Sequence, residues 1–368
     1  MSVLTIVGFI GGLALLVVGA NLLVKGSSGI ARRFGISSLV IGLTVVAYGT
    51  SSPEMAVSVA GAAGDNPGVA LGNVLGSTVA NVLLILGISA LFGPMLVQRR
   101  LIRIEVPIMV GLVVVTYFLA WNEVIGRVEG VLLFLLAIAY TVFTIRTSRK
   151  DPEEQEAVAG REESPKRQHG IGLNIVFALI GLGTLVGGSQ LMVNSAVDIA
   201  SALGLSDVII GLTVVAVGTS LPEIATSIAA AIKGDRDLAV GNVVGSNIFN
   251  MTAVLGLSGM AASNGLPVPE SMLSFDFPVM LAVCIACLPI FFTGHVIMRW
   301  EGVVFLAYYA AYVAYLVLSS TDRDRAEQFN FALIAFVIPL TVITFLVLVV
   351  REVRGRMLNR PYAAPEPQ

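Results

Sequence analysis

The chain has 368 residues, of which 56% are hydrophobic and 12% are charged, with a mean hydropathy of +0.89 and a formal net charge of −2. Because soluble domains carry about 25% charged residues, this composition excludes a soluble globular protein and indicates a polytopic membrane protein. The chain has only two histidines and two cysteines. Cys284 and Cys287 lie together in one apolar run, so we interpret them as small apolar residues rather than a redox or metal pair.

Eleven apolar stretches are long enough to cross about 30 Å of hydrocarbon. No positive region precedes the first, and a similar segment recurs in mid-chain, so we interpret it as a membrane helix rather than a signal peptide. The eleventh lies outside the duplication described below and is interpreted as an appended helix. In chain order the predicted spans are 3–24, 38–63, 69–92, 104–121, 128–146, 171–193, 207–232, 238–261, 274–293, 300–318 and 329–350.

The basic residues sort to alternate sides of these spans. Loops 1–2, 3–4, 5–6, 7–8 and 9–10 and the C-terminal tail hold 19 of the 22 Lys and Arg residues. The positive-inside rule therefore predicts a cell-membrane protein with its N-terminus outside and its C-terminus in the cytoplasm. The polar segment 147–170 has mixed charge and two prolines, which favours a flexible cytoplasmic linker over a regulatory ion site.

The chain contains an internal duplication. Residues 12–89 align with 181–258 without a gap, and 37 of the 78 positions are identical. Five spans separate matching positions, and since five is odd the two copies enter the membrane in opposite orientations. We therefore predict an all-α membrane fold made of two inverted-topology five-helix repeats plus one extra C-terminal helix. The predicted parts are repeat 1–146, linker 147–170, repeat 171–318, and an appended helix with a cytoplasmic tail at 319–368.

Each copy carries the motif GTS-x-PE in the middle of a span, ending at Glu54 and Glu223. Proline removes a backbone donor and breaks the helix, so we expect carbonyls such as those of Ala47 and Ala216 to be freed toward an ion. A carboxylate at membrane depth is costly and is by default functional. No Lys or Arg lies in the four repeat helices to neutralise the pair. The competing interpretation is two protonated glutamates hydrogen-bonded inside the bundle.

The next helix of each copy places further oxygen-bearing side chains on one face, one helical turn apart. They are Ser77 and Asn81 in the first copy and Ser246 and Asn250 in the second, with Asn73 and Asn242 one turn further along. Carboxylate, hydroxyl, amide and carbonyl oxygens without Cys or His describe a hard-cation site. A flexible oxygen cage suits Ca²⁺ better than Mg²⁺, and two carboxylates match its charge. Sodium uses the same oxygen chemistry.

At these motifs the sequence resembles the Ca²⁺/cation antiporter superfamily, and among its branches the prokaryotic Na⁺/Ca²⁺ exchangers. Both α-repeats of that family are matched, through GTS-x-PE and GN-x-x-GS-N-x-x-N/D. The resemblance implies ten core helices, a diamond of cation sites between helices 2, 3, 7 and 8, and sliding of helices 1 and 6 for alternating access. It implies Glu54 and Glu223 as central Ca²⁺ ligands. The further ligands it implies are Thr50, Ser51, Ser77, Thr219, Ser220 and Ser246, the backbone of Ala47 and Ala216, and Asn81 and Asn250.

Two positions depart from the family pattern. Asn250 stands where the second repeat often has Asp, and Thr78 stands where the second copy has Asn247. With amides at both 81 and 250 the site has two potential charges, so a third bound Na⁺ is less favourable. We therefore hypothesise that stoichiometry or counter-ion differs from three-Na⁺ exchange, and H⁺ or K⁺ coupling stays open.

The predicted activity is antiport of Ca²⁺ against Na⁺ across the bilayer, with both ions competing for the two glutamates. A Ca²⁺/H⁺ antiporter on the same scaffold is the first alternative. An intramembrane metal-dependent enzyme would need a catalytic metal and a positioned nucleophile, and the repeat helices contain no His. A passive channel is disfavoured by the inverted repeat. We expect no enzyme activity, cofactor, nucleic acid or obligate protein partner.

Overall fold

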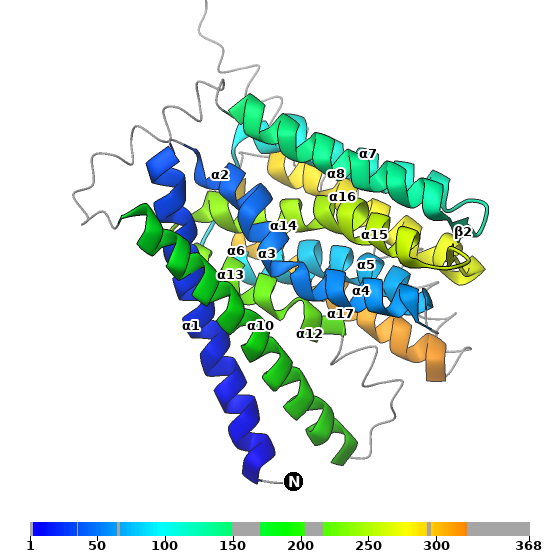
Figure 1. Cartoon of the computed structure of the whole chain (residues 1–368), viewed down its shortest axis with the longest axis horizontal. Coiled ribbons are helices and arrows are strands. Elements are labelled where there is room, and N and C mark those ends of the chain that lie inside the picture. The colour runs from blue at the N-terminus through cyan, green and yellow to red at the C-terminus, as the bar shows by residue number, and fades with distance from the viewer. Residues whose placement is uncertain are drawn as a thin grey trace, which may run out of the picture.

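The computed structural model describes residues 3–34, 36–64, 67–148, 170–202, 216–292 and 296–321. The predicted appended helix at 329–350 and most of the predicted linker at 147–170 lie outside these ranges. Within them the chain is almost entirely helical (Figure 1), which confirms a predominantly helical polytopic fold. A helical fold is expected for so apolar a chain, because a helix pairs its own backbone N–H and C=O groups where lipid offers no partners.

The first half begins with one long helix and continues with helices interrupted by π-helical turns, which carry η labels. Its elements are α1 (Val3–Phe34), α2 (Ser38–Ile41), η1 (Gly42–Val46), α3 (Ala47–Thr50), α4 (Ser52–Ala63), α5 (Pro67–Ala80), η2 (Asn81–Leu86), α6 (Gly87–Phe92), β1 (Met95–Leu96), η3 (Leu101–Glu105), α7 (Val106–Leu119), β2 (Val124–Ile125) and α8 (Arg127–Ser148).

The second half follows the same order. Its elements are α10 (Ile171–Ala202), α12 (Ala216–Thr219), α13 (Leu221–Ile232), α14 (Arg236–Phe249), η5 (Asn250–Val254), α15 (Leu255–Ala261), β3 (Leu266–Pro267), η6 (Met272–Asp276), α16 (Phe277–Phe292), β4 (Val296–Ile297) and α17 (Arg299–Thr321). The predicted span 207–232 is described only from Ala216 onward.

Seven described helices are long and apolar enough to cross a membrane, and three apolar helices are shorter. The shorter ones are Ser38–Thr50, Leu221–Ile232 and Met272–Leu288. The first two of these end or begin at the GTS-x-PE break, because the break divides a span into two pieces neither of which crosses alone. The long spans run over Leu4–Ala31, Pro67–Phe92, Leu101–Leu119, Arg127–Thr147, Ile171–Ala196, Arg236–Ala261 and Arg299–Ser319.

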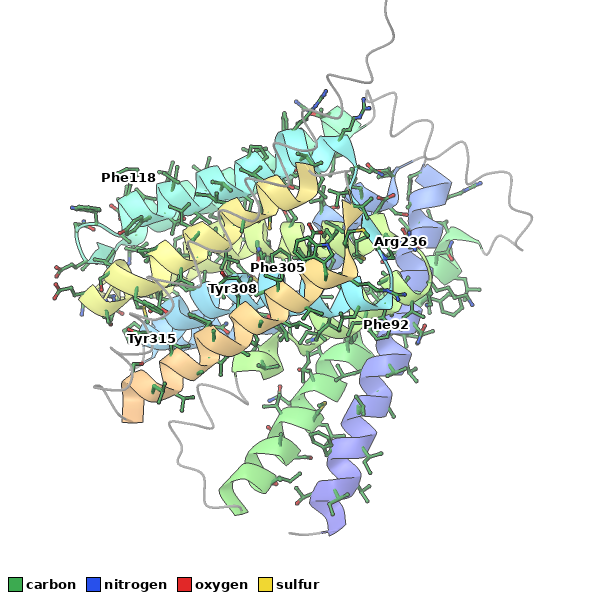
Figure 2. The ribbon with its side chains drawn as sticks, turned by 180° about the vertical axis from the view of Figure 1, so that it is seen from behind. Phe92, Phe118, Arg236, Phe305, Tyr308 and Tyr315 are labelled. Carbon is green, nitrogen blue, oxygen red and sulfur yellow. The ribbon has the colours of Figure 1, made fainter. Side chains whose placement is uncertain are left out.

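Burial separates central from peripheral helices. The apolar window of Arg236–Ala261 is 100% buried, whereas that of Arg299–Ser319 is 11% buried and presents its side chains outward. Figure 2 shows Tyr308 and Tyr315 spaced along α17, and Phe118, 69% exposed, near the end of α7. Large apolar side chains on the outside of a helical bundle are what lipid contact requires. The helices carrying the GN-x-x-GS motifs therefore lie in the protein interior.

Helices α1 and α10 form an antiparallel pair that crosses the remaining helices at an angle (Figure 1). Glycines allow the two backbones to touch. A Cβ added at Gly12 would lie 2.8 Å from the Gly188 oxygen, and one at Gly19 would lie 2.8 Å from the Gly181 oxygen. Such small-residue contacts replace the hydrophobic driving force that helices lack inside lipid.

Short antiparallel strands tie the two halves together. Strand β1 pairs with β4, and β2 pairs with β3, so each ribbon joins a loop of the first half to a loop of the second. Each ribbon therefore adds backbone pairing between the halves outside the helices.

Candidate functional site

The two helix breaks have nearly the same backbone geometry. Ser51, between α3 and α4, has φ −81° and ψ 9°, and Ser220, between α12 and α13, has φ −86° and ψ 4°. A proline in the first turn of each following helix fits this geometry, since the missing N–H is not needed there. Glu54 and Glu223 consequently lie in the first turns of α4 and α13, where the helix dipole favours negative charge.

The serine of each break donates a hydrogen bond to the glutamate of the other half. Ser51 Oγ lies 2.7 Å from Glu223 Oε1, and Ser220 Oγ lies 3.1 Å from Glu54 Oε1. Glu54 is 1% exposed and Glu223 is fully buried. Because bonds to an ionised acceptor are stronger than neutral ones, each half orients the carboxylate of the other. The structure thus brings together the two glutamates that the sequence singled out.

A second set of crossed bonds surrounds the glutamates. The Asn73 amide donates to Ser58 and the Asn242 amide donates to Ser227, both over 2.9 Å. Across the halves, a threonine hydroxyl donates to each amide oxygen over 3.2 Å, in the pairs Thr50–Asn242 and Thr219–Asn73. Both amides are therefore engaged by protein groups, and they brace the broken helices. The sequence had placed these asparagines on the ligand face without revealing this role.

Several buried oxygens at the centre of this cluster have no protein partner. In the described part of the chain eleven buried side-chain polar atoms lack one, and six of them belong to the cluster. Unpartnered buried polar atoms are rare and call for an explanation such as a bound ion. The six atoms are Glu54 Oε2, Glu223 Oε2, Ser246 Oγ, Asn81 Oδ1, Asn250 Oδ1 and Asn250 Nδ2.

Residues of the flanking helix contribute unequally. Ser77 Oγ lies 3.3 Å from Ser220 Oγ. The Asn81 side-chain amide donates over 3.0 Å to the side-chain oxygen Oδ1 of Asn247. Asn247 was noted in the sequence only as a difference from Thr78, and nothing there indicated that it would position Asn81.

Another buried glutamate elsewhere in the fold shows how the protein neutralises an acid that is structural. Glu105 is fully buried and accepts from Arg100 Nε over 3.0 Å and from the Tyr140 hydroxyl over 2.7 Å. In the described part of the four repeat helices the one basic residue is Arg236, the first residue of α14, so the expectation of none there is wrong, but Arg236 begins its helix more than two turns before Ser246. Two carboxylates held together without a base form a site whose charge is matched by one divalent or two monovalent cations.

The expected freeing of the Ala47 carbonyl is wrong. This carbonyl accepts the Ser51 backbone N–H over 3.0 Å, and Thr50 Oγ1 lies 3.3 Å from it. Proline removes the donor of the carbonyl four residues before it, which in the second half is that of Gly218. There the Ser189 hydroxyl of α10 donates instead, over 2.7 Å. Ala216 begins α12, directly after the undescribed residues 203–215.

The fold and this cluster together define a polytopic helical membrane protein with an oxygen-rich interior site between two broken helices. The sequence model of the sodium/calcium exchanger protein family matches residues 4–146 and 173–318. The chain therefore belongs to the sodium/calcium exchanger family.

Two relatives and one solved structure are similar to this chain along most of its length. The CaxA protein of Alkalimonas amylolytica is 36% identical over 312 residues, covering 84% of this chain and 97% of its own. The sodium/calcium exchanger MaX1 of Methanosarcina acetivorans is 35% identical over 338 residues, covering 83% and 96%. A solved structure of the sodium–calcium exchanger NCX_Mj superimposes with a TM-score of 0.74 at 33% identity, covering 86% of this chain and 100% of that one.

Proposed function

We propose that the chain is a secondary active antiporter that exchanges Ca²⁺ for Na⁺ across the cell membrane. The observation that carries the proposal is the pair of buried glutamates, each bonded through one oxygen to the opposite half and each with its second oxygen unpartnered. Two such carboxylates supply the charge that a bound Ca²⁺ needs. Membership of the sodium/calcium exchanger family supports the same activity.

The proposed ligands follow the oxygens of the cluster. Glu54 and Glu223 are the central Ca²⁺ ligands, and Asn81 and Asn250 complete the site through their unpartnered carbonyl oxygens. Flanking Na⁺ or Ca²⁺ contacts come from hydroxyl and carbonyl oxygens around them. These are the hydroxyls of Thr50, Ser51, Ser77, Thr219, Ser220 and Ser246 and the carbonyl of Ala216. The Ala47 carbonyl is left out of this set because the Ser51 N–H already bonds to it.

Transport in this proposal follows from an inverted repeat. The crossed bonds come in pairs related by the 169-residue offset of the duplication, as expected when two copies of opposite orientation share one site near mid-membrane. Ca²⁺ and Na⁺ occupy the glutamates in turn. Passage of the empty, doubly charged site between the two sides is disfavoured, because unpaired charge is costly at low dielectric. The N-terminus lies outside in this arrangement and the tail is cytoplasmic.

The charge of the site also bears on coupling. Amides at 81 and 250 leave two carboxylates, so one Ca²⁺, two Na⁺ or two H⁺ would each neutralise it. We therefore infer exchange with fewer than three Na⁺ per Ca²⁺, and proton coupling is the second candidate on the same charge balance. Clamping the membrane potential of proteoliposomes with valinomycin tests the inference. A strong effect of potential on Ca²⁺ flux, as three-for-one exchange produces, would contradict it.

The direct test is ⁴⁵Ca²⁺ uptake into proteoliposomes loaded with Na⁺, beside vesicles carrying only a pH gradient. We expect uptake that depends on internal Na⁺ and is lost in Glu54→Gln and Glu223→Gln, both still inserted in the membrane. Uptake driven by the pH gradient alone would assign proton coupling instead. Retained exchange in either variant would refute the proposed site.

A further inference from the structure

A groove of about 340 Å³ lies between α1 and α13, apart from the cation cluster. Its walls are apolar except at one end, where Asn21 and Lys233 line it. Leu16 and Ala20 form its buried floor, whereas Leu13 and Val17 on its rim are about half exposed. A volume of this size with apolar walls and few polar groups is typical of sites for small amphiphilic ligands.

Two lysines lie near the polar end of the groove, and one of them, Lys233, lines it. Lys233, at the C-terminus of α13, donates over 3.0 Å to the Asn21 carbonyl oxygen of α1. Lys25, one turn further along α1, lies 4.4 Å from the centre of the Phe177 ring. Both side chains are exposed. Partial burial, and then the charge of Lys25, lower the pKa of Lys233, so an anion placed beside the two lysines would relieve their repulsion.

A carboxylate, that of Asp235, lies two residues after Lys233 in the chain. Asp235 accepts hydrogen bonds from Ser28 over 3.0 Å and from Ser38 over 3.2 Å. These two bonds anchor the turn at 234–237 to α1 and α2. The turn therefore fixes where Lys233 lies relative to α1.

We propose that this groove binds an anionic membrane lipid, with an acyl chain along α13 and the headgroup phosphate at Lys25 and Lys233. The site is distinct from the cation cluster and does not depend on which ions are exchanged. Negatively charged headgroups are attracted to lysines at the membrane surface, and both lysines lie on the side where basic residues gather.

The length of the groove favours a lipid over a soluble anion. Its lining on α13 runs from Leu221, beside the helix break, to Lys233. Twelve residues of helix span about 18 Å, a little more than half of the roughly 30 Å hydrocarbon core. An acyl chain of one leaflet therefore fits alongside α13, with the lysines at headgroup depth. Soluble phosphate would use only the charged end and leave the apolar walls unfilled.

The test is lipid binding to the purified full-length chain in neutral detergent, measured by native mass spectrometry during titration with phosphatidylglycerol. Phosphatidylcholine with the same acyl chains is the zwitterionic comparison. We expect one phosphatidylglycerol molecule to bind per chain, in preference to phosphatidylcholine. Lys25→Gln and Lys233→Gln should each weaken it about fivefold, since a lysine near an anionic headgroup contributes on that order.

Two further variants make the result specific. Arg146→Gln removes an exposed positive charge at the end of α8, on the same predicted side but away from the groove, and should leave binding unchanged. Ala229→Leu narrows the groove and should weaken the binding of both phosphatidylglycerol and phosphatidylcholine. Equal losses in the Arg146 variant, or no loss in the lysine variants, would overturn the proposal. Two other results would also overturn it. One is complete displacement of phosphatidylglycerol by glycerol 3-phosphate, and the other is an Ala229→Leu variant whose oligomeric state changes while the number of bound lipids per chain does not.

Discussion

The breaks at Ser51 and Ser220 share backbone angles to within a few degrees, yet their surroundings differ. Beside the first, Tyr48 stacks on Phe249 with ring centres 4.3 Å apart and is hydrogen-bonded to Thr141. Val217 holds the matching place in the second half. The polar residues that bond to the glutamates or surround them are thus duplicated, whereas the aromatic packing of Tyr48 outside them is not.

This division suggests which residues the site cannot vary. A cation held between two halves needs matched ligands from both, so the serines and glutamates have remained identical in the two copies. We call the residues outside this matched set, such as Tyr48, the outer layer. They contact only protein, so each half can pack there in its own way. Substitutions within the matched set should then have equal effects in the two halves, whereas substitutions in the outer layer should have unequal ones.

The largest effect is expected for the glutamates themselves. Glu54→Gln and Glu223→Gln each remove half of the site's charge while keeping its shape, so both should reduce Na⁺-dependent ⁴⁵Ca²⁺ exchange by about a hundredfold or more. The two losses should be alike within experimental error. Glu105→Gln is not a suitable control, because it would remove the carboxylate that pairs with the buried Arg100.

A loss in only one of the two glutamate variants would break the equivalence of the halves. Membrane insertion and thermal stability of the purified variants should be measured alongside. An inactive variant that is also unfolded would be replaced by Glu→Asp at the same position, which keeps the charge and shortens the side chain. We expect that replacement to weaken Ca²⁺ affinity in both halves.

The crossing serines come next. Ser51→Ala removes the donor to Glu223, and Ser220→Ala removes the donor to Glu54. A hydrogen bond to a charged group contributes about 1.5–3 kcal/mol, so each change should raise the Ca²⁺ concentration for half-maximal exchange by about 10- to 100-fold. The measurement is initial uptake rate against external Ca²⁺.

Ser52→Ala is the matched control for the serine variants. Its hydroxyl donates to the Tyr48 carbonyl and not to a glutamate, and the second half has Leu221 at this position. We expect an unchanged concentration dependence. A shift as large as that of Ser51→Ala would mean that disturbance of the break, rather than loss of the crossed bond, explains the serine results.

Position 247, where the two halves differ, should give a smaller effect on Ca²⁺ affinity, and the effect should appear in one half only. Asn247→Thr removes the carbonyl that accepts the Asn81 amide, so Asn81 is less firmly positioned and Ca²⁺ affinity should fall about fivefold. Thr78, its counterpart, donates within its own helix to the Val74 carbonyl. Thr78→Asn should therefore change affinity less, and equal effects would show that the halves are equivalent here after all.

Much of the site could be predicted from sequence because its signal is local and repeated. A proline beside a glutamate at membrane depth predicts a helix break with a buried carboxylate next to it, and the duplication predicts the same geometry twice. The crossing of the bonds could not be read in this way. Which serine meets which glutamate depends on how the halves pack, and residues 51 and 223 lie 172 positions apart.

One expectation failed for a local reason. The Ala47 carbonyl was expected to be free because proline breaks the helix. Pro53 instead removes the donor of the carbonyl four residues before it, at Gly49, and a 3.0 Å bond from the Ser51 N–H keeps the Ala47 turn closed. The partner of a released carbonyl could not be predicted at all, since the Gly218 carbonyl is bonded by Ser189 of a different helix. The position of a proline indicates which carbonyl loses its backbone donor. It does not indicate which side chain of another helix replaces that donor.

The smallest predicted effect concerns the carbonyl that proline does release. Ser189→Ala removes the donor to the Gly218 carbonyl and leaves a buried acceptor unsatisfied, which costs about 1 kcal/mol. The melting temperature of the purified protein should fall by about 2 °C, with little change in Ca²⁺ affinity, since Ser189 does not touch the glutamates. Ala20 holds the matching place in the first half and has no hydroxyl, so Ala20→Ser offers a donor where none existed and should not lower the melting temperature. If Ser189→Ala instead weakened Ca²⁺ binding as strongly as Ser51→Ala, the outer layer of the second half would belong to the site, and the division between a matched centre and a variable surround would fail.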